Sequence, residues 1–219
     1  MDDNGIRIDI IRPQYAKGLE RLQRDCFPTL ADSELMREEH FLMHCKLFPE
    51  GNFVALHGER VVGLGAGFLI DFDFRRPQHR FMDILAHGYY TNHNPKGAYY
   101  YGADMSVHPD YRRRGIARRL YDARKGIIRK LNRRGLVAGG LIPDYAKHKA
   151  YMSAEEYVAR VVAGELYDST LSVQLKNGFR VVTMLRDYIE DSASDNWAAL
   201  ILWENPDYDR HRHPHQARA

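Results

Sequence analysis

The 219-residue sequence predicts an α/β fold, and three observations support this prediction. Seven short apolar runs have the composition and alternation of β-strands. Five longer segments carry apolar residues at helical spacing on one face. Along the chain the order is one strand, two helices, three strands, a helix, a strand, two helices and two strands. We expect a single domain over residues 1–205, followed by a polar, mobile tail over residues 206–219.

The N-terminal part predicts a strand, two helices and a β-hairpin. Apolar and polar residues alternate over 6–11, as in a half-buried strand. Pro13 is expected to start a helix, since proline is favoured at the first helical position. Asp32 or Ser33 is expected to cap a second helix that already includes Leu35. The predicted hairpin strands are Phe53–Leu56 and Arg60–Phe68.

The most informative segment joins a predicted strand, Tyr99–Val107, to a predicted helix that begins near Gly115. The first backbone N–H groups of a helix have no partner inside it, and the helix dipole adds positive potential there. A glycine lets a ligand approach the backbone closely. The arrangement therefore favours binding of a phosphate or pyrophosphate. Its residues are Arg112, Arg113, Arg114, Gly115, Ile116 and Ala117.

The C-terminal part predicts a strand, two helices and two further strands. Gly135 is expected to end the preceding helix, and the small apolar residues over 136–142 are expected to form a strand. A Ser153-x-x-Glu156 capping box opens the next helix. The last predicted elements are a short helix from 168–170 to Asn177-Gly178 and the strands Phe179–Leu185 and Ala198–Trp203.

Composition and charge exclude several classes of protein. The net charge of +3 is small, and no apolar run approaches the roughly 20 residues of a membrane helix. Met1–Asn4 lacks the basic and apolar regions of a signal peptide. Cys26 and Cys45 therefore predict reduced, buried thiols in a cytoplasmic protein.

Three further patterns are interpreted as structural. The basic helix favours a solvated face over a nucleic-acid surface, because no aromatic residues are interleaved. Gly63-x-Gly65-x-Gly67 indicates a strand with one bare face, since its spacing differs from the dinucleotide fingerprint. His211-x-His213-x-His215 has no second cluster to complete a site, so no metal is expected. The basic residues are Arg118, Arg119, Arg124, Lys125, Arg129, Lys130, Arg133 and Arg134.

The motif Arg112-x-x-Gly115-x-Ala117 follows the strand-ending Val107 by five residues and resembles the acetyl-CoA pyrophosphate loop of the GNAT N-acetyltransferases. The order of predicted elements is similar to that family's fold over residues 5–205. The resemblance implies a mixed, mostly antiparallel seven-stranded sheet with helices on both faces. It also implies direct transfer of an acetyl group from acetyl-CoA to an amine in a ternary complex.

Several other segments resemble the acetyltransferase domain that is found fused ahead of a carbon–nitrogen hydrolase domain. This similarity implies a functional link to such a hydrolase, whether the chain is free-standing or one domain of a larger assembly. The segments are Tyr121–Lys125, Ala138–Pro143, Met152–Tyr157 and Gln174–Phe179.

The family resemblance implies roles for the loop and for the strand before it. The backbone of Arg113–Ala117 would hold the pyrophosphate, with Arg112 at the first motif position. Met105, Ser106 and Val107 would bond the pantetheine arm through a strand that splays at a bulge. The backbone N–H of Met105 would stabilise the developing oxyanion.

Asp104 is the candidate base, because an acid at this place in the strand could take a proton from the amine. The alternative interpretation is a structural or substrate-orienting carboxylate. The family's usual acid is a tyrosine five residues before the phenylalanine of the Gly-Phe pair, where this sequence has Gln174. Tyr145, Tyr151, Tyr167 or water could replace it.

The missing tyrosine leaves a second hypothesis, a non-catalytic acyl-CoA-binding sensor or partner module for a hydrolase. A third is a nucleic-acid binder that uses the basic helix; the small net charge does not by itself imply nucleic acid. The acceptor stays open between a small-molecule amine and a protein amine. Asp71, Asp73 and Asp83, in the irregular segment 71–98, would favour a cationic acceptor if they line its pocket. Pairing through the last strands, common in the family, would give a homodimer.

Overall fold

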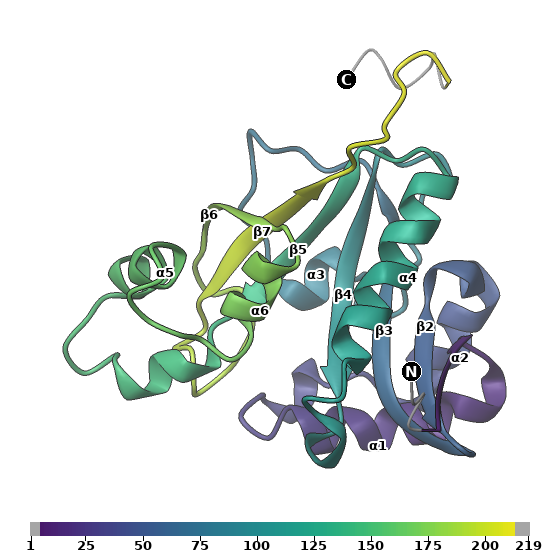
Figure 1. Ribbon diagram of the computed structural model, residues 1–219, viewed down its shortest axis with the longest axis horizontal. Coiled ribbons are helices and arrows are strands. Elements are labelled where there is room, and N and C mark those ends of the chain that lie inside the picture. Colours follow the sequence, from purple (N-terminus) through teal and green to yellow (C-terminus); the bar gives the residue numbers. More distant parts are fainter. Residues whose placement is uncertain (1–4, 213–219) are drawn as a thin grey trace.

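The computed structural model describes residues 5–212, which form one seven-stranded sheet in the order β1-β2-β3-β4-β5-β7-β6 (Figure 1). Neighbouring strands are antiparallel except β4 and β5, which are parallel. The predicted mixed, mostly antiparallel sheet is therefore confirmed. The strands are β1 (Ile6–Ile10), β2 (Phe53–His57), β3 (Arg60–Ile70), β4 (Tyr99–Val107), β5 (Gly135–Leu141), β6 (Arg180–Leu185) and β7 (Ala198–Glu204).

Helices cover both faces of the sheet. They are α1 (Ala16–Cys26), α2 (Glu38–Leu47), α3 (Phe81–Ile84), α4 (Ile116–Lys130), α5 (Ala154–Val162) and α6 (Leu171–Lys176). Alternate residues of β3 face different layers: Leu64 and Ala66 pack in the core with α1, whereas a Cβ on Gly63 or Gly65 would touch side chains of α4. Figure 1 shows α4 crossing the sheet at β3 and β4. The bare strand face predicted for these glycines is thus occupied by a helix.

Two predicted helix boundaries are wrong. The second helix begins at Glu38, because Asp32–Glu34 form one separate 3-10 turn and Leu35 is extended. The backbone N–H of Arg37 donates a hydrogen bond to His40 Nδ1 at 3.0 Å, and this contact fixes the start of α2. Gly135 does not end a helix: α4 stops at Lys130, and Gly135 is the first residue of β5.

The capping box predicted in the C-terminal part is confirmed in one of its two bonds. Ser153 Oγ accepts the backbone N–H of Glu156 at 3.1 Å at the start of α5, whereas the Glu156 side chain pairs with Arg160 at 2.8 Å. Asp168 Oδ1 accepts the backbone N–H groups of Thr170 and Leu171, each at 2.8 Å, so α6 begins at Leu171. In segment 71–98 the structure shows turns around the single short helix α3.

The sheet opens between β4 and β5. These strands pair only over three residues, Tyr99–Tyr101 with 135–137. The register between β3 and β4 shifts beside Ala66, so Ala103 is an extra residue between the paired Gly102 and Asp104. Such a bulge bends a strand and increases its twist. Beyond Tyr101, β4 therefore keeps β3 on one side and diverges from β5 on the other.

Several other predictions concern membrane-spanning helices, metal sites and the two cysteines. No helix within residues 5–212 is long and apolar enough to cross a membrane. In that same range no three His, Cys, Asp or Glu residues are grouped to hold a metal, and His213 and His215 lie outside it. Both cysteines are free, but Cys45 is only half-buried. Met1–Asn4 and the tail residues 213–219 lie outside the described residues as well.

Candidate functional site

Two cavities open where β4 and β5 diverge, one on each face of the sheet. The α4-side cavity, of about 110 Å³, is bounded by β4, β5, α4 and α6. The α1-side cavity, of about 40 Å³, is bounded by β4, β5, α1 and the turn before α2. Molecules bound on the two faces can therefore meet in the gap between the strands. The residues that line both cavities are Phe27, Ala103, Asp104, Gly139 and Leu141.

Asp104 lies at the junction of the two cavities and is 6% exposed. Its Oδ2 accepts a 2.6 Å hydrogen bond from Gln23 Nε2, and its Oδ1 has no partner among the described residues. Burial raises the pKa of Asp104 to about 6, against the opposing effects of the Gln23 bond, the nearby Ser106 hydroxyl and the Arg124 charge. A carboxyl group with this pKa is ionised near neutral pH and can accept a proton.

Arg124 is a buried cation in the wall of the α4-side cavity, and it is 2% exposed. Its Nη1 donates to the backbone carbonyl of Asp104 at 3.4 Å, while its Nε has no partner among the described residues. Gly102 makes room for it, because a Cβ there would overlap Nη2. The interpretation of the basic residues as a solvated face is therefore wrong at Arg124 and at Arg133, which is 7% exposed, although Arg118 is 83% exposed.

The predicted phosphate-binding loop lies at the N-terminus of α4. Gly115 adopts a left-handed conformation with φ of +76°, and no atom lies within 4 Å of where its Cβ would be. Arg112 Nε donates to the carbonyl oxygen of Val107 at 3.2 Å, which ties the loop to the end of β4. The loop presents open backbone and positive charge, as a pyrophosphate requires. Arg112, Arg113, Arg114 and Gly115 are exposed, Ala117 is half-buried and Ile116 is buried.

The predicted pantetheine-binding strand segment has one unpaired edge. Met105 lines the α4-side cavity. Ser106 is buried, its Oγ has no partner among the described residues, and Val107 is half-buried. Because β5 has diverged, this edge of β4 is available for strand-like hydrogen bonds to an extended ligand.

Gln174 lines the α4-side cavity, is 7% exposed, and leaves its Oε1 without a partner among the described residues. None of the three tyrosines suggested as replacement acids lines either cavity. Tyr151 and Tyr167 are exposed, and the hydroxyl of Tyr145 donates to a backbone carbonyl at 2.8 Å. The tyrosine that lines the α4-side cavity is Tyr121, on α4.

The three aspartates of segment 71–98 line neither cavity. Asp71 Oδ1 accepts a hydrogen bond from the backbone N–H of Ala98 at 2.9 Å, so it joins the two ends of segment 71–98. Asp73 pairs with the exposed Arg75. The residue that this segment contributes to the α1-side cavity is Phe81.

Six polar residues that line the cavities are missed by the sequence predictions: Gln23, Glu34, Tyr121, Arg124, Thr170 and Tyr188. Two of them carry a signal, since a polar residue at a buried-face position of an amphipathic helix needs a partner or a ligand. Arg124 lies four residues after Leu120, and Gln23 lies four residues after Leu19. Glu34 has no such signal, because its place depends on contacts with residues far along the chain.

The chain is similar to known proteins both in sequence and in fold. A family model described as "Acetyltransferase (GNAT) family" matches residues 16–151. "Uncharacterized N-acetyltransferase YkwB" of Bacillus subtilis (strain 168) is 33% identical over 90% of this chain and 89% of its own length. "Probable hydrolase YhcX" of the same organism is 43% identical over 91% of this chain. The chain spans 39% of the length of YhcX.

Two solved structures share the fold with a TM-score of 0.77 each. The "GphF GNAT-like decarboxylase in complex with isobutyryl-CoA" is 21% identical and covers 91% of this chain and 99% of its own. The "loading GNATL domain of CurA from Lyngbya majuscula" is 16% identical and covers 91% of this chain and 98% of its own. At these identities the likeness shows the architecture alone.

Proposed function

The chain belongs to the GNAT acetyltransferase family, and from this premise we propose that it transfers an acetyl group from acetyl-CoA to an amine by direct attack. The observation that carries the proposal is the pair of cavities on opposite faces of the sheet, which share Asp104 and Gly139. Acetyl-CoA on the α4 side and an amine on the α1 side would react in the gap between β4 and β5.

Acetyl-CoA would supply a thioester carbonyl to the gap and its pyrophosphate to the loop. The backbone N–H groups of Arg113–Ala117 would hold the pyrophosphate, with Arg112 beside it. The free edge of β4, over Met105–Val107, would bond the pantetheine amides. These residues are proposed from the exposed loop, the left-handed Gly115 and the unpaired strand edge.

Asp104 would act as the base. The amine nitrogen forms the new bond to the thioester carbon, and the carbon–sulfur bond breaks with its electron pair on sulfur. The proton that leaves the nitrogen goes to Asp104, directly or through water, because the carboxylate is ionised above its pKa of about 6. The backbone N–H of Met105 would stabilise the oxyanion between these steps.

Tyr121 is our candidate for the group that protonates the departing thiolate. It lines the α4-side cavity beside Gln174, and burial raises the pKa of its hydroxyl, so the proton is present at neutral pH. A Tyr121→Phe variant tests this role, with loss of kcat and an unchanged affinity for acetyl-CoA as the expected result.

A second candidate function is an acyl-CoA-binding module that serves a hydrolase partner without transferring the acetyl group. Gln174 favours it, because glutamine cannot act as an acid where the family uses tyrosine. The name and greater length of YhcX are consistent with a hydrolase link.

Calorimetric titration of acetyl-CoA, followed by a thiol-release screen across amines, tests both candidates. Micromolar binding with amine-dependent thiol release supports the transferase. Binding without release with any amine supports the module, and no binding contradicts both.

A further inference from the structure

The α1-side cavity contains two buried acidic side chains and no basic one. Glu34 is 7% exposed and Asp104 is 6% exposed. Each leaves one oxygen, Glu34 Oε2 and Asp104 Oδ1, without a hydrogen-bond partner among the described residues. Burying a carboxylate without a compensating donor or cation costs free energy, so both groups are suited to a cationic ligand. The remaining walls are mostly apolar and aromatic: Phe27, Leu30, Phe81, Tyr188 and Ile189.

The position of Glu34 is fixed by the chain between β6 and β7. Glu34 Oε1 accepts the backbone N–H of Glu190 at 3.2 Å. The backbone N–H of Ala31 donates to the Glu190 carbonyl at 2.9 Å, and that of Ser192 donates to the Thr29 carbonyl at 3.2 Å. One oxygen of Glu34 therefore holds the carboxylate in place, while the other is buried without a partner among the described residues.

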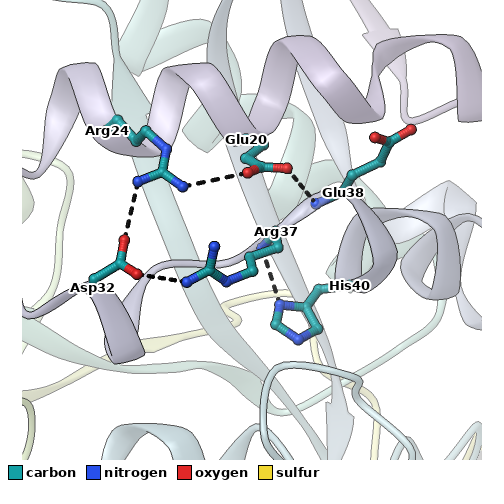
Figure 2. A network of polar contacts seen from close by, with 6 residues as sticks. All are labelled: Glu20, Arg24, Asp32, Arg37, Glu38 and His40. Carbon is teal, nitrogen blue, oxygen red and sulfur yellow. Dashed lines mark hydrogen bonds and ion pairs between the residues drawn. The ribbon is translucent and has the colours of Figure 1, made fainter.

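The turn that carries Glu34 is also held from outside (Figure 2). Asp32 pairs with Arg24 of α1 at 3.0 Å and with Arg37, just before α2, at 2.6 Å. Glu20 of α1 accepts the backbone N–H of Glu38 at 3.0 Å. The two ion pairs are exposed and each contributes little stability, but together with the half-buried Glu20–Glu38 bond they orient the turn between the two helices.

Burial and three nearby charges act on Glu34. Burial raises the pKa of Glu34, while the backbone N–H of Glu190 and the positive charge of Arg80 lower it; the charges of Glu190 and Asp83 raise it by smaller amounts. Arg80 does not line the α1-side cavity, so a cation bound there would face the two carboxylates directly.

We propose that the acceptor is a small unbranched diamine, whose reacting amine lies at Asp104 and whose other ammonium lies against Glu34. The methylene groups between the two nitrogens would contact the apolar and aromatic walls. This inference rests on the proposed transferase activity, because Asp104 serves there as the base. It extends that activity by assigning Glu34 as a specificity-determining residue for the acceptor.

The experiment compares unbranched diamines of three to six carbons with monoamines of the same length, as acceptors from acetyl-CoA. It uses the wild type, Glu34→Gln and Asp32→Asn. Glu34→Gln keeps the oxygen that accepts from Glu190 but removes the charge. Asp32→Asn removes a carboxylate from the same turn outside the cavity, where the side chain is 63% exposed.

We expect the wild type to favour its best diamine over the matched monoamine by about tenfold or more in kcat/KM, because a buried charge left unpaired strongly disfavours the monoamine. Glu34→Gln should abolish this preference: kcat/KM for the diamine should fall because its second ammonium loses its partner, and kcat/KM for the monoamine should rise because no buried charge is left unpaired. Asp32→Asn should retain the preference. Equal use of diamines and monoamines by an active wild type, or an unchanged preference in Glu34→Gln, would overturn the inference.

A binding measurement separates this inference from the proposed function. 1,4-Diaminobutane is titrated calorimetrically into the wild type and Glu34→Gln, each saturated with CoA. Binding that depends on Glu34 without any thiol release would support the diamine site and contradict the transferase. Thiol release with monoamines, together with no Glu34-dependent diamine binding, would contradict the diamine site alone.

Discussion

Gln23 of α1 donates a 2.6 Å hydrogen bond to Asp104 of β4, which joins two buried side chains 81 positions apart at the gap in the sheet. This bond stabilises the ionised carboxylate and holds the pKa of Asp104 below the value that burial alone would give. Gln23 is therefore a positioning residue for the proposed base.

The first prediction concerns the Gln23–Asp104 hydrogen bond. In the wild type, kcat/KM should rise with pH through a limb near 6, because only ionised Asp104 accepts a proton. Gln23→Leu should move this limb to higher pH, since the donor to the carboxylate is lost. A pH–rate profile of both proteins measures the shift, and a limb that stays in place would show that Asp104 does not control the rate.

Asp104→Asn should stabilise the fold at neutral pH while it lowers activity. The folded pKa of Asp104 is raised from 3.8 to about 6, so stability in the wild type falls as pH rises through that window. The amide in Asp104→Asn carries no charge, so the stability of this variant does not fall over the same pH range. The free energy of unfolding of Asp104→Asn should exceed that of the wild type by about 2–3 kcal/mol above pH 7, and the difference should shrink toward pH 4. Urea unfolding at several pH values checks it; a difference that does not vary with pH would contradict the raised pKa.

Gly102→Ala should be destabilising because the new Cβ would overlap the guanidinium of Arg124. Overpacking of this kind costs about 1–3 kcal/mol, and the displaced Arg124 should also weaken acetyl-CoA binding. Gly126→Ala, on the open face of α4, is the matched control. It should stabilise the protein by up to about 1 kcal/mol through helix propensity. Thermal unfolding of the two variants should therefore shift in opposite directions.

Ala117→Glu should reduce the affinity for acetyl-CoA by about tenfold or more, because it places a negative charge in the proposed pyrophosphate site. The fold should tolerate it, since an acidic residue is favourable in the first turn of a helix. Gly126→Glu adds the same charge to α4 away from the loop and should leave the affinity unchanged. Calorimetric titration compares them, and equal affinities in both variants would place the cofactor elsewhere.

Local patterns predicted most of the fold. Tyr99–Val107 is a strand with the predicted bounds, and the left-handed Gly115 starts α4 after it, because alternation and turn chemistry act within a few residues. The predicted start of the second helix is wrong, because Asp32 pairs with Arg24 and Arg37 across the turn rather than capping a helix.

The site could be predicted only in part. Asp104 and the loop are found from a strand, a turn and a helix in sequence. Glu34 enters the α1-side cavity through backbone contacts with residues 190–192, which no local pattern reveals. Arg124 lies among charged residues that are predicted to be solvated, although its spacing from Leu120 places it on the buried face of α4.

The central claim, that Asp104 removes a proton from an amine attacking acetyl-CoA, is tested most directly by thiol release from acetyl-CoA in the presence and absence of amine. The wild type should release thiol only with amine. Asp104→Asn should bind acetyl-CoA equally well but release thiol about 10²–10⁴-fold more slowly, as expected for loss of a general base. Amine-dependent release at the wild-type rate in Asp104→Asn would contradict the account.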